Sequence, residues 1–350
     1  MSIDTIWYTR CPVPTAFAIA VKLGWLDEEF ERDGIVFRSL ASSLDPVVRQ
    51  SHFAHTQPNS TRHGGAIPPL VTRSRGRDLR LVGLSVTSWR QQVLALPGSG
   101  IKGAADLKGR RLSIPRRVND PIDFWRATVL RGFDLVLSQA GLTFDDVVPV
   151  DFQIQRRFID DATATTDRSE ILWNAGFMLG YQRDEAAALL RGDVDAIFTQ
   201  GGGGVTVLGY TGARVVAEVD DSGDDLASFV NNQPFTLTVS GALADVRPDI
   251  PARLVARVRE AAGWAHDNER EAKRIIAAET GLPEQFVDHA YGPKVHQQLD
   301  IDLTPRRVAA LQTLHDDLLS RDFLARPLDL DAFIDRRPLA GASDFARRAA

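Results

Sequence analysis

A single cysteine lies where a ligand-binding cleft would need a reactive group. Cys11 follows a predicted strand at residues 4–9 and precedes a predicted helix at 15–23, with Pro12 between them. In α/β proteins, ligands collect at the carboxyl ends of strands, and a helix N-terminus with nearby cations lowers the pKa of a thiol. We interpret Cys11 as a candidate catalytic thiol; the alternative is a small buried hydrophobic side chain.

A second group of candidates is concentrated in residues 51–70. This segment holds three of the seven histidines, Arg62, and the pair Gly64 and Gly65, directly before a predicted helix at 66–76. Glycine lets backbone N–H groups approach a ligand, a helix N-terminus favours an anion, and a guanidinium grips two anionic oxygens. The segment predicts a site for a carboxylate, sulfinate or sulfonate. The alternative is an ordinary glycine turn with a solvated arginine.

The histidines of this segment raise the question of a metal site. His52, His55 and His63 carry imidazole, a common zinc ligand, and Cys11 could complete the set. Their spacing matches no metal motif, because the stretch is not expected to be one regular helix and no HExxH or CxxC is present. We therefore expect no metal. A histidine beside the thiol would hydrogen-bond it or help to hold its charge, and a histidine satisfied inside the fold is the alternative.

Length and composition bound the kind of protein that carries these residues. The 350 residues are 44% hydrophobic and 25% charged, which is typical of a soluble globular chain with two lobes or two domains. The 41 basic and 46 acidic residues give a net charge of −5, so we expect no nucleic-acid partner. The sequence contains neither an apolar run of about 18 residues nor a signal-peptide pattern. We expect a cytoplasmic monomer with no membrane partner.

The elements that must position these residues alternate along the chain. Further strands are predicted at 34–40, 79–86, 91–97, 110–115, 145–153, 193–199, 213–219 and 235–243. Further helices are predicted within 122–140, at 183–191, and through most of the chain after 248. This alternation predicts an α/β fold with parallel sheets covered by helices. The glycine run 201–204 is interpreted as a flexible loop between lobes, because no Walker lysine or GxGxxG pattern accompanies it.

Two segments resemble the type II periplasmic-binding-protein superfamily. They are ADLKGRRLSIP at 105–115 and LLRGDVDAIFT at 189–199. The resemblance implies a two-lobed fold with a ligand cleft between the lobes. The first lobe would comprise 1–93 plus 235–350 and carry the cysteine, histidine and arginine, and the second would comprise 94–234 and cover the cleft. A non-catalytic binding protein for sulfonates or related anions is one function that fits this fold.

Two longer strings resemble the 2'-hydroxybiphenyl-2-sulfinate desulfinase family of the dibenzothiophene desulfurisation pathway. They are YTRCPVPTA at 8–16 and HFAHTQPNSTRHGGAIPPL at 52–70. By matching motif, the resemblance implies an active site formed by Cys11, His52, Arg62 and Gly65. It implies hydrolytic cleavage of the C–S bond of a small aromatic sulfinate, giving sulfite, without a cofactor. An aromatic decarboxylase on the same fold is a further alternative, since a carboxylate fits the same arginine pocket.

An aryl sulfinate has an anionic head and an apolar ring that needs an aromatic wall. Arg62 and the glycine N–H groups would hold the head, and Phe53 is the first candidate for the wall. Other candidate wall residues are Trp7, Trp125, Phe177 and Phe198. His55 and Gln57 complete the expected substrate-binding set, together with Gly64 and Gly65.

The sequence departs from the family pattern in the substrate region. His55 and His63 stand where the family has aromatic residues, and the glycines 201–204 replace a stretch that contains tryptophan. These changes predict an aryl group that is smaller, more polar or differently shaped. Two mechanisms stay open: the Cys11 thiolate attacks sulfur, or the Cys11 thiol protonates the ring carbon, with His52 orienting it in either case.

Overall fold

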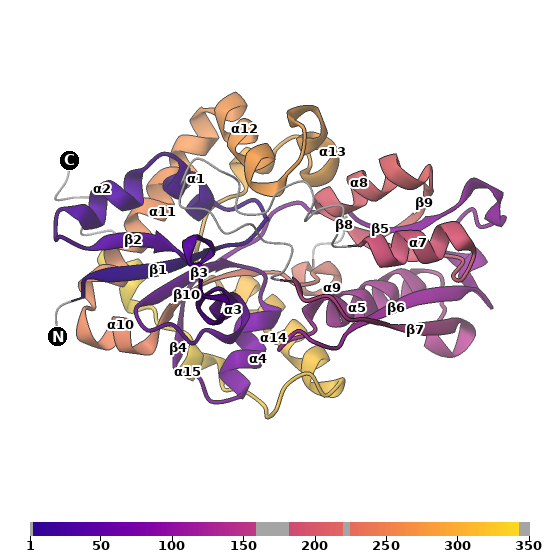
Figure 1. Ribbon diagram of the computed structural model, residues 1–350, viewed down its shortest axis with the longest axis horizontal. Helices are drawn as coiled ribbons and strands as arrows, with labels where there is room; N and C mark the ends of the chain where they lie inside the picture. The colour runs from indigo at the N-terminus through magenta and orange to yellow at the C-terminus, as the bar shows by residue number, and fades with distance from the viewer. Residues whose placement is uncertain (1–2, 159–181, 220–224, 343–350) are drawn as a thin grey trace.

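The computed structural model describes residues 3–158, 182–219 and 225–342. In Figure 1 these residues form two lobes that lie side by side along the long axis of the molecule. Each lobe has its own strands, with helices packed around them. The mixed α/β, two-lobed architecture predicted from the sequence is confirmed.

Lobe one is built on a five-stranded sheet of order β2-β1-β3-β10-β4. Strand β1 (Thr5–Arg10) pairs in parallel with β2 (Val36–Ser39) and with β3 (Ser60–Gly64). Strand β10 (Phe235–Ser240) runs antiparallel to both β3 and β4 (Leu79–Ser85). The parallel pairing of β1 and β3 places their carboxyl ends at the same edge of the sheet, where the predicted site residues begin.

Lobe two contains two smaller sheets. Strand β5 (Gln91–Ala95) lies between β8 (Ile197–Gln200) and β9 (Arg214–Glu218) and is antiparallel to both. Strands β6 (Arg111–Arg117) and β7 (Val148–Ile154) pair in parallel. The expectation of parallel sheets is therefore wrong for β10 and for the β8-β5-β9 sheet, because strand and helix alternation does not fix the direction of strands that arrive from the other lobe.

Strand pairing also bears on where the chain crosses between lobes. All of β5 belongs to the second lobe's sheet, and the chain re-enters the first sheet with β10. A division after residue 93 would cut β5. We propose that the first crossing precedes Gln91 and that the return lies just before Phe235.

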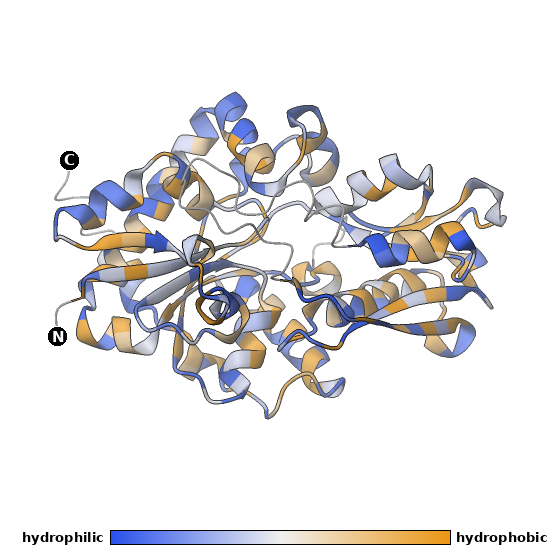
Figure 2. Cartoon of the chain, in the orientation of Figure 1, coloured by the Kyte–Doolittle hydropathy of each residue, from blue (hydrophilic) through white to orange (hydrophobic). Residues whose placement is uncertain are grey.

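Helices cover both faces of the first sheet. Helix α1 (Ala16–Lys22) begins after Thr15, whose hydroxyl accepts a hydrogen bond from the Ala18 N–H, and packs against α11 (Asp249–Asp267) and α12 (Glu269–Thr280). In Figure 2, hydrophilic residues are frequent on the outer helices α2 and α12. The remaining helices are α2 (Trp25–Glu31), α3 (Pro46–Ala54), α4 (Ile67–Ser74), α5 (Phe124–Gln139), α7 (Arg183–Arg191), α8 (Gly201–Thr211), α9 (Leu226–Phe229), α10 (Gly241–Val246), α13 (Val287–Tyr291), α14 (Pro305–Ser320) and α15 (Leu330–Phe333).

Helix α3 carries His52 and was not predicted. Asp45 caps its first turn, accepting the Val47 N–H at 2.8 Å, and proline fills the first helical position. His52 lies in the helix, whereas His55 ends it with a φ of 50°. The glycines 201–204 form the first turn of α8, so their interpretation as a flexible loop is wrong.

The hydrophobic core joins the two lobes. On one face of the first sheet, Leu81 and Leu84 pack in a cluster that continues through α14 into lobe two, where it includes Val93 and Trp125. A second cluster fills the opposite face, between the sheet and α1 and α11. Within the part of the chain that is described, no helix is long and apolar enough to cross a membrane.

Candidate active site

Cys11 lies directly after β1, at the carboxyl edge of the first sheet. The residue is 6% exposed, and the Gly65 N–H donates a hydrogen bond to its sulfur. A Cβ atom at Gly64 would lie only 2.2 Å from the Cys11 Sγ, so no larger residue fits beneath the thiol. Gly64 does not line the ligand cavity. Glycine is needed at this position because a side chain would collide with Cys11.

Arg62 lies next to Cys11 because β3 pairs with β1 in a register that sets Thr9 opposite Arg62. The arginine is 4% exposed. Its Nη1 donates to the Gly65 carbonyl at 2.8 Å, and no described residue forms a hydrogen bond with its Nε. Among the described residues no carboxylate pairs with this guanidinium. A buried cation without a counter-ion is a binding site for an anion.

His52 approaches the same place from α3. Its imidazole meets the Phe53 ring edge to face, with centroids 4.6 Å apart, and stacks on Phe158 at 6.0 Å. Burial, and then the nearby charge of Arg62, hold the pKa of His52 well below its ordinary value. The imidazole is therefore neutral at physiological pH.

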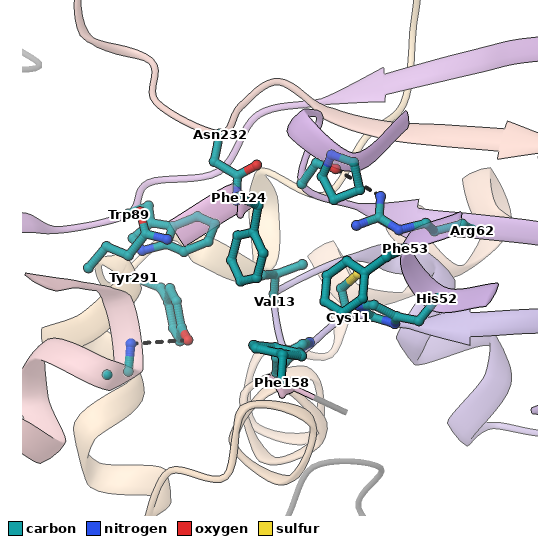
Figure 3. Close-up of a pocket in the computed structure, with 16 residues that line it drawn as sticks. Cys11, Val13, His52, Phe53, Arg62, Trp89, Phe124, Phe158, Asn232 and Tyr291 are labelled. Atoms are coloured by element: carbon teal, nitrogen blue, oxygen red, sulfur yellow. Dashed lines mark hydrogen bonds between the residues drawn. The ribbon is translucent and has the colours of Figure 1, made fainter. Parts of the chain in front are cut away.

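These groups open into one cavity. The empty space of this cavity, counted out to its opening to solvent, is about 650 Å³. Figure 3 shows Arg62, His52 and Cys11 on one side and Trp89 and Tyr291 on the other. The lining residues are Cys11, Pro12, Val13, His52, Phe53, Arg62, Gly65, Pro68, Trp89, Phe124, Phe158, Gln200, Gly202, Gly203, Asn232 and Tyr291.

The aromatic wall of the cavity is shared between the lobes. Phe53 of lobe one packs on Phe124 and Phe158 of lobe two, with ring centroids 5.7 Å and 5.3 Å apart. The Phe158 N–H donates to Asp120 at 2.9 Å, and the Arg117 guanidinium lies 5.8 Å from the centre of the Phe158 ring. A buried ion pair between Arg117 and Asp120 thus supports the part of the wall that faces His52.

The charge state of the thiol differs from what its position in the sequence suggested. Burial raises the pKa of Cys11 and outweighs the Arg62 charge and the Gly65 hydrogen bond, which lower it. The expectation of a lowered pKa is wrong, because a thiol sealed from water loses more solvation as a thiolate than the arginine restores. The resting site therefore holds a neutral thiol, a neutral imidazole and a charged guanidinium.

Several predicted residues lie outside the cavity. His55 contacts the Phe53 carbonyl through Nδ1 at 2.9 Å, and the Gln57 N–H donates to Ser51 at 2.9 Å, so both support the turn after α3. Phe177 lies outside the described residues.

The other wall candidates also pack elsewhere. Trp7 lies under the Arg38 guanidinium, the Trp125 indole donates to Glu185 at 2.5 Å, and the ring of Phe198 fills the space beside Gly132. None of these three aromatic residues lines the cavity.

Sequence reasoning missed most of the far side of the cavity. The missed lining residues with polar or aromatic side chains are Trp89, Phe124, Phe158, Gln200, Asn232 and Tyr291. Only Gln200 could have been found from the sequence, since it directly follows the predicted strand 193–199 and precedes the glycine run, where a cleft ligand is expected. The others come from separate segments that only the fold brings together.

The histidines do not gather around a metal. His63 points its Nε2 to the Ser85 hydroxyl at 3.0 Å, away from the cavity lining. Across residues 3–158, 182–219 and 225–342, no group of three metal-ligating side chains is close enough to hold an ion.

Known proteins with a similar sequence identify the family. No family model matches the chain. It is 31% identical to 2'-hydroxybiphenyl-2-sulfinate desulfinase of Rhodococcus erythropolis and to that of Rhodococcus qingshengii, over 94% of this chain and 90% of each relative. The chain belongs to this desulfinase family. The resemblance drawn from the two sequence strings is thereby confirmed, and it extends well beyond them.

Solved structures show the same fold as this desulfinase-family chain. The desulfurization enzyme DszB matches with a TM-score of 0.77 and 29% identity, covering 98% of this chain and 99% of that one. A mutant of DszB in complex with biphenyl-2-sulfinic acid matches with a TM-score of 0.75 and 27% identity, covering 98% and 100%. The periplasmic aliphatic sulphonate binding protein SsuA from Escherichia coli shares the fold at a TM-score of 0.64 and 19% identity, covering 95% and 92%.

Proposed function

We propose that this member of the desulfinase family cleaves the C–S bond of an aryl sulfinate with water, giving bisulfite and the arene. The observation that carries the proposal is the Arg62 guanidinium, which is buried without a carboxylate partner among the described residues and lies beside a cysteine thiol. A sulfinate would supply the missing negative charge. Its ring would then rest against Phe53, Phe124 and Phe158, which line the same cavity.

The charge states support a route in which Cys11 is the acid. The thiol transfers its proton to the ring carbon that bears sulfur, the C–S bonding pair becomes the new C–H bond, and sulfur dioxide leaves. Water adds to the sulfur dioxide to give bisulfite, and the proton released returns to the thiolate. The sum is sulfinate plus water giving arene plus bisulfite. A raised thiol pKa keeps the proton in place until the substrate is bound.

The nucleophilic route finds less support. It begins with a thiolate that attacks sulfur, and a thiolate needs a partner that accepts its proton. His52 is a poor acceptor, since burial and Arg62 hold its pKa well below the ordinary value. We assign His52 the role of orienting the thiol. Mass spectrometry of enzyme quenched during turnover separates the routes, because only nucleophilic attack leaves an S–SO₂ adduct on Cys11.

The proposal is tested by sulfite release from biphenyl-2-sulfinate. Wild-type enzyme should release sulfite and biphenyl in equal amounts, and Cys11→Ser should abolish turnover while calorimetry still detects binding. Sulfite release by Cys11→Ser at a near-normal rate would remove the thiol from the mechanism. Tight binding without turnover by the wild type would instead indicate an anion-binding protein, and carbon dioxide from aryl carboxylates would indicate a decarboxylase.

A further inference from the structure

The cavity has a second polar end, opposite the arginine. Figure 3 shows Trp89 and Tyr291 across the cavity from Arg62 and His52, with Phe124 and Val13 between them. Gln200 belongs to this far end, because it directly precedes α8, whose Gly202 N–H donates to the Tyr291 hydroxyl at 3.3 Å. The role proposed above for Cys11 and Arg62 uses none of these groups.

Within the described part of the chain, two polar groups at this end lack hydrogen-bond partners. Gln200 is 7% exposed and lines the cavity, and its Oε1 is a buried acceptor without a hydrogen bond. Trp89 also lines the cavity, and its Nε1–H is a buried donor without a hydrogen bond. Such groups are normally satisfied in folded proteins, and leaving them unpaired is unfavourable.

The two residues that carry these unpaired groups are neighbours. A Cβ atom on Gly201 would lie 2.6 Å from the Trp89 Nε1, so the indole edge rests on the backbone that directly follows Gln200. Tyr291 limits the space on the same side, since that Cβ would lie 2.9 Å from its ring. The Tyr291 hydroxyl already accepts the Gly202 N–H. The open acceptor and the open donor are therefore those of Gln200 and Trp89.

We propose that Gln200 and Trp89 form a subsite for a hydroxyl group on the aryl substrate, and that they determine specificity in the proposed desulfinase reaction, on which this inference rests. A hydroxyl donates to the Gln200 Oε1 and accepts from the Trp89 Nε1–H, so one group satisfies both partners. A carboxylate would satisfy only the indole, and a hydrogen or methyl neither. Because Arg62 holds the sulfinate at the opposite end, the hydroxyl belongs on the ring edge far from sulfur.

The experiment compares biphenyl-2-sulfinate with its 2'-, 3'- and 4'-hydroxy derivatives. We expect the 3' or 4' hydroxyl to raise kcat/KM roughly tenfold over the parent, since each neutral hydrogen bond contributes roughly twofold to tenfold. Gln200→Leu should remove most of this gain, and Trp89→Phe, which keeps an aromatic ring and deletes the N–H, should reduce it. Each variant is compared by the ratio of its kcat/KM on the hydroxy derivative to its kcat/KM on the parent compound. This ratio does not depend on how much of the enzyme is folded, and the rate on the parent compound alone reports any loss of folded enzyme.

Gln182→Leu is the matched control. Gln182 is buried, a Cβ on Gly203 of α8 would lie 2.9 Å from its Oε1, and it does not line the cavity, so its loss should leave the substrate ratio unchanged. The subsite is refuted if neither the 3'- nor the 4'-hydroxy derivative exceeds the parent, or if the gain survives in both Gln200→Leu and Trp89→Phe. Dissociation constants of the four compounds for Cys11→Ser protein give the same comparison without turnover. An enzyme that releases no sulfite but prefers the hydroxylated ligands would refute the desulfinase proposal and retain the subsite.

Discussion

Replacing Arg62 separates its effect on stability from its effect on catalysis. The guanidinium is 4% exposed, makes one hydrogen bond to the Gly65 carbonyl, and pairs with no carboxylate among the described residues. A methionine at this position keeps an unbranched apolar stem and removes the charged guanidinium. Its effect on the ligand-free protein is the difference between two opposing contributions.

The two contributions nearly cancel in the ligand-free protein. Losing a hydrogen bond made by a charged donor costs about 1.5–3 kcal/mol. Removing a buried, uncompensated charge removes a desolvation cost on the order of several kcal/mol. We expect Arg62→Met to keep the free energy of unfolding within about 2 kcal/mol of wild type, or to raise it. Urea unfolding followed by circular dichroism measures this.

In the proposed reaction, the same substitution removes the counter-ion of the substrate. Two charge-assisted hydrogen bonds to a sulfinate contribute about 3–6 kcal/mol, which corresponds to a roughly 10²- to 10⁴-fold loss in kcat/KM. Arg62→Lys keeps a positive charge but lacks the planar, two-pronged guanidinium, so its kcat/KM should lie between those of wild type and Arg62→Met. Retention of kcat/KM within tenfold by Arg62→Met would refute the assignment. A loss of unfolding free energy far beyond 2 kcal/mol would show that the arginine is a structural group.

Three further predictions follow from the packing and the charge states. Gly64→Ala should lower kcat/KM roughly 100-fold, because its Cβ would lie 2.2 Å from the Cys11 Sγ; a normal rate of sulfite release would contradict this. The pKa of Cys11 is raised from 9.0, so kcat should stay level through neutral pH and fall only above pH 9, whereas a thiolate nucleophile would give a rate that rises with pH. Burial raises the pKa of Glu185 to about 7 from 4.5, so its stabilising contribution is present below pH 4.5 and is lost as the pH rises through 7. Between pH 5 and pH 8, the free energy of unfolding measured in urea should fall by up to about 3 kcal/mol more for wild type than for Glu185→Gln. An equal change in the two proteins would contradict the raised pKa.

The reactive end of the cavity was predictable because its residues lie close to strand ends. Cys11 follows β1 and Arg62 lies near the end of β3, and two adjacent parallel strands bring such positions together. Gly65 was recognised from the same short string. His52 was recognised only through the family motif, since the helix that carries it was missed despite Asp45 and its following proline.

The far end of the cavity was not predictable from sequence spacing. Phe158 and Phe124 belong to lobe two and reach His52 and Phe53 only because the lobes pack together. Their sequence neighbourhood looks like that of any buried aromatic residue. The prediction of a lowered pKa for the Cys11 thiol failed for a related reason. The direction of the shift depends on how completely the fold removes water from Cys11, and no local pattern of residues shows this.

Burial sets the charge states of the three groups in the site. It keeps Cys11 protonated and His52 neutral, and it leaves the Arg62 charge as the one uncompensated charge among these three groups. In the proposed reaction, a bound sulfinate brings the sum of charges to zero. When the thiol proton moves to carbon and sulfur dioxide leaves, the negative charge passes from the sulfinate to the Cys11 sulfur, and the sum stays zero. A Cβ on Gly64 would lie 2.2 Å from that sulfur and 3.4 Å from the Arg62 Nη2, so the guanidinium is near the thiolate as well as the substrate. In the proposed route, one arginine therefore serves as counter-ion before and after proton transfer, so that no net charge develops in the low-dielectric cavity.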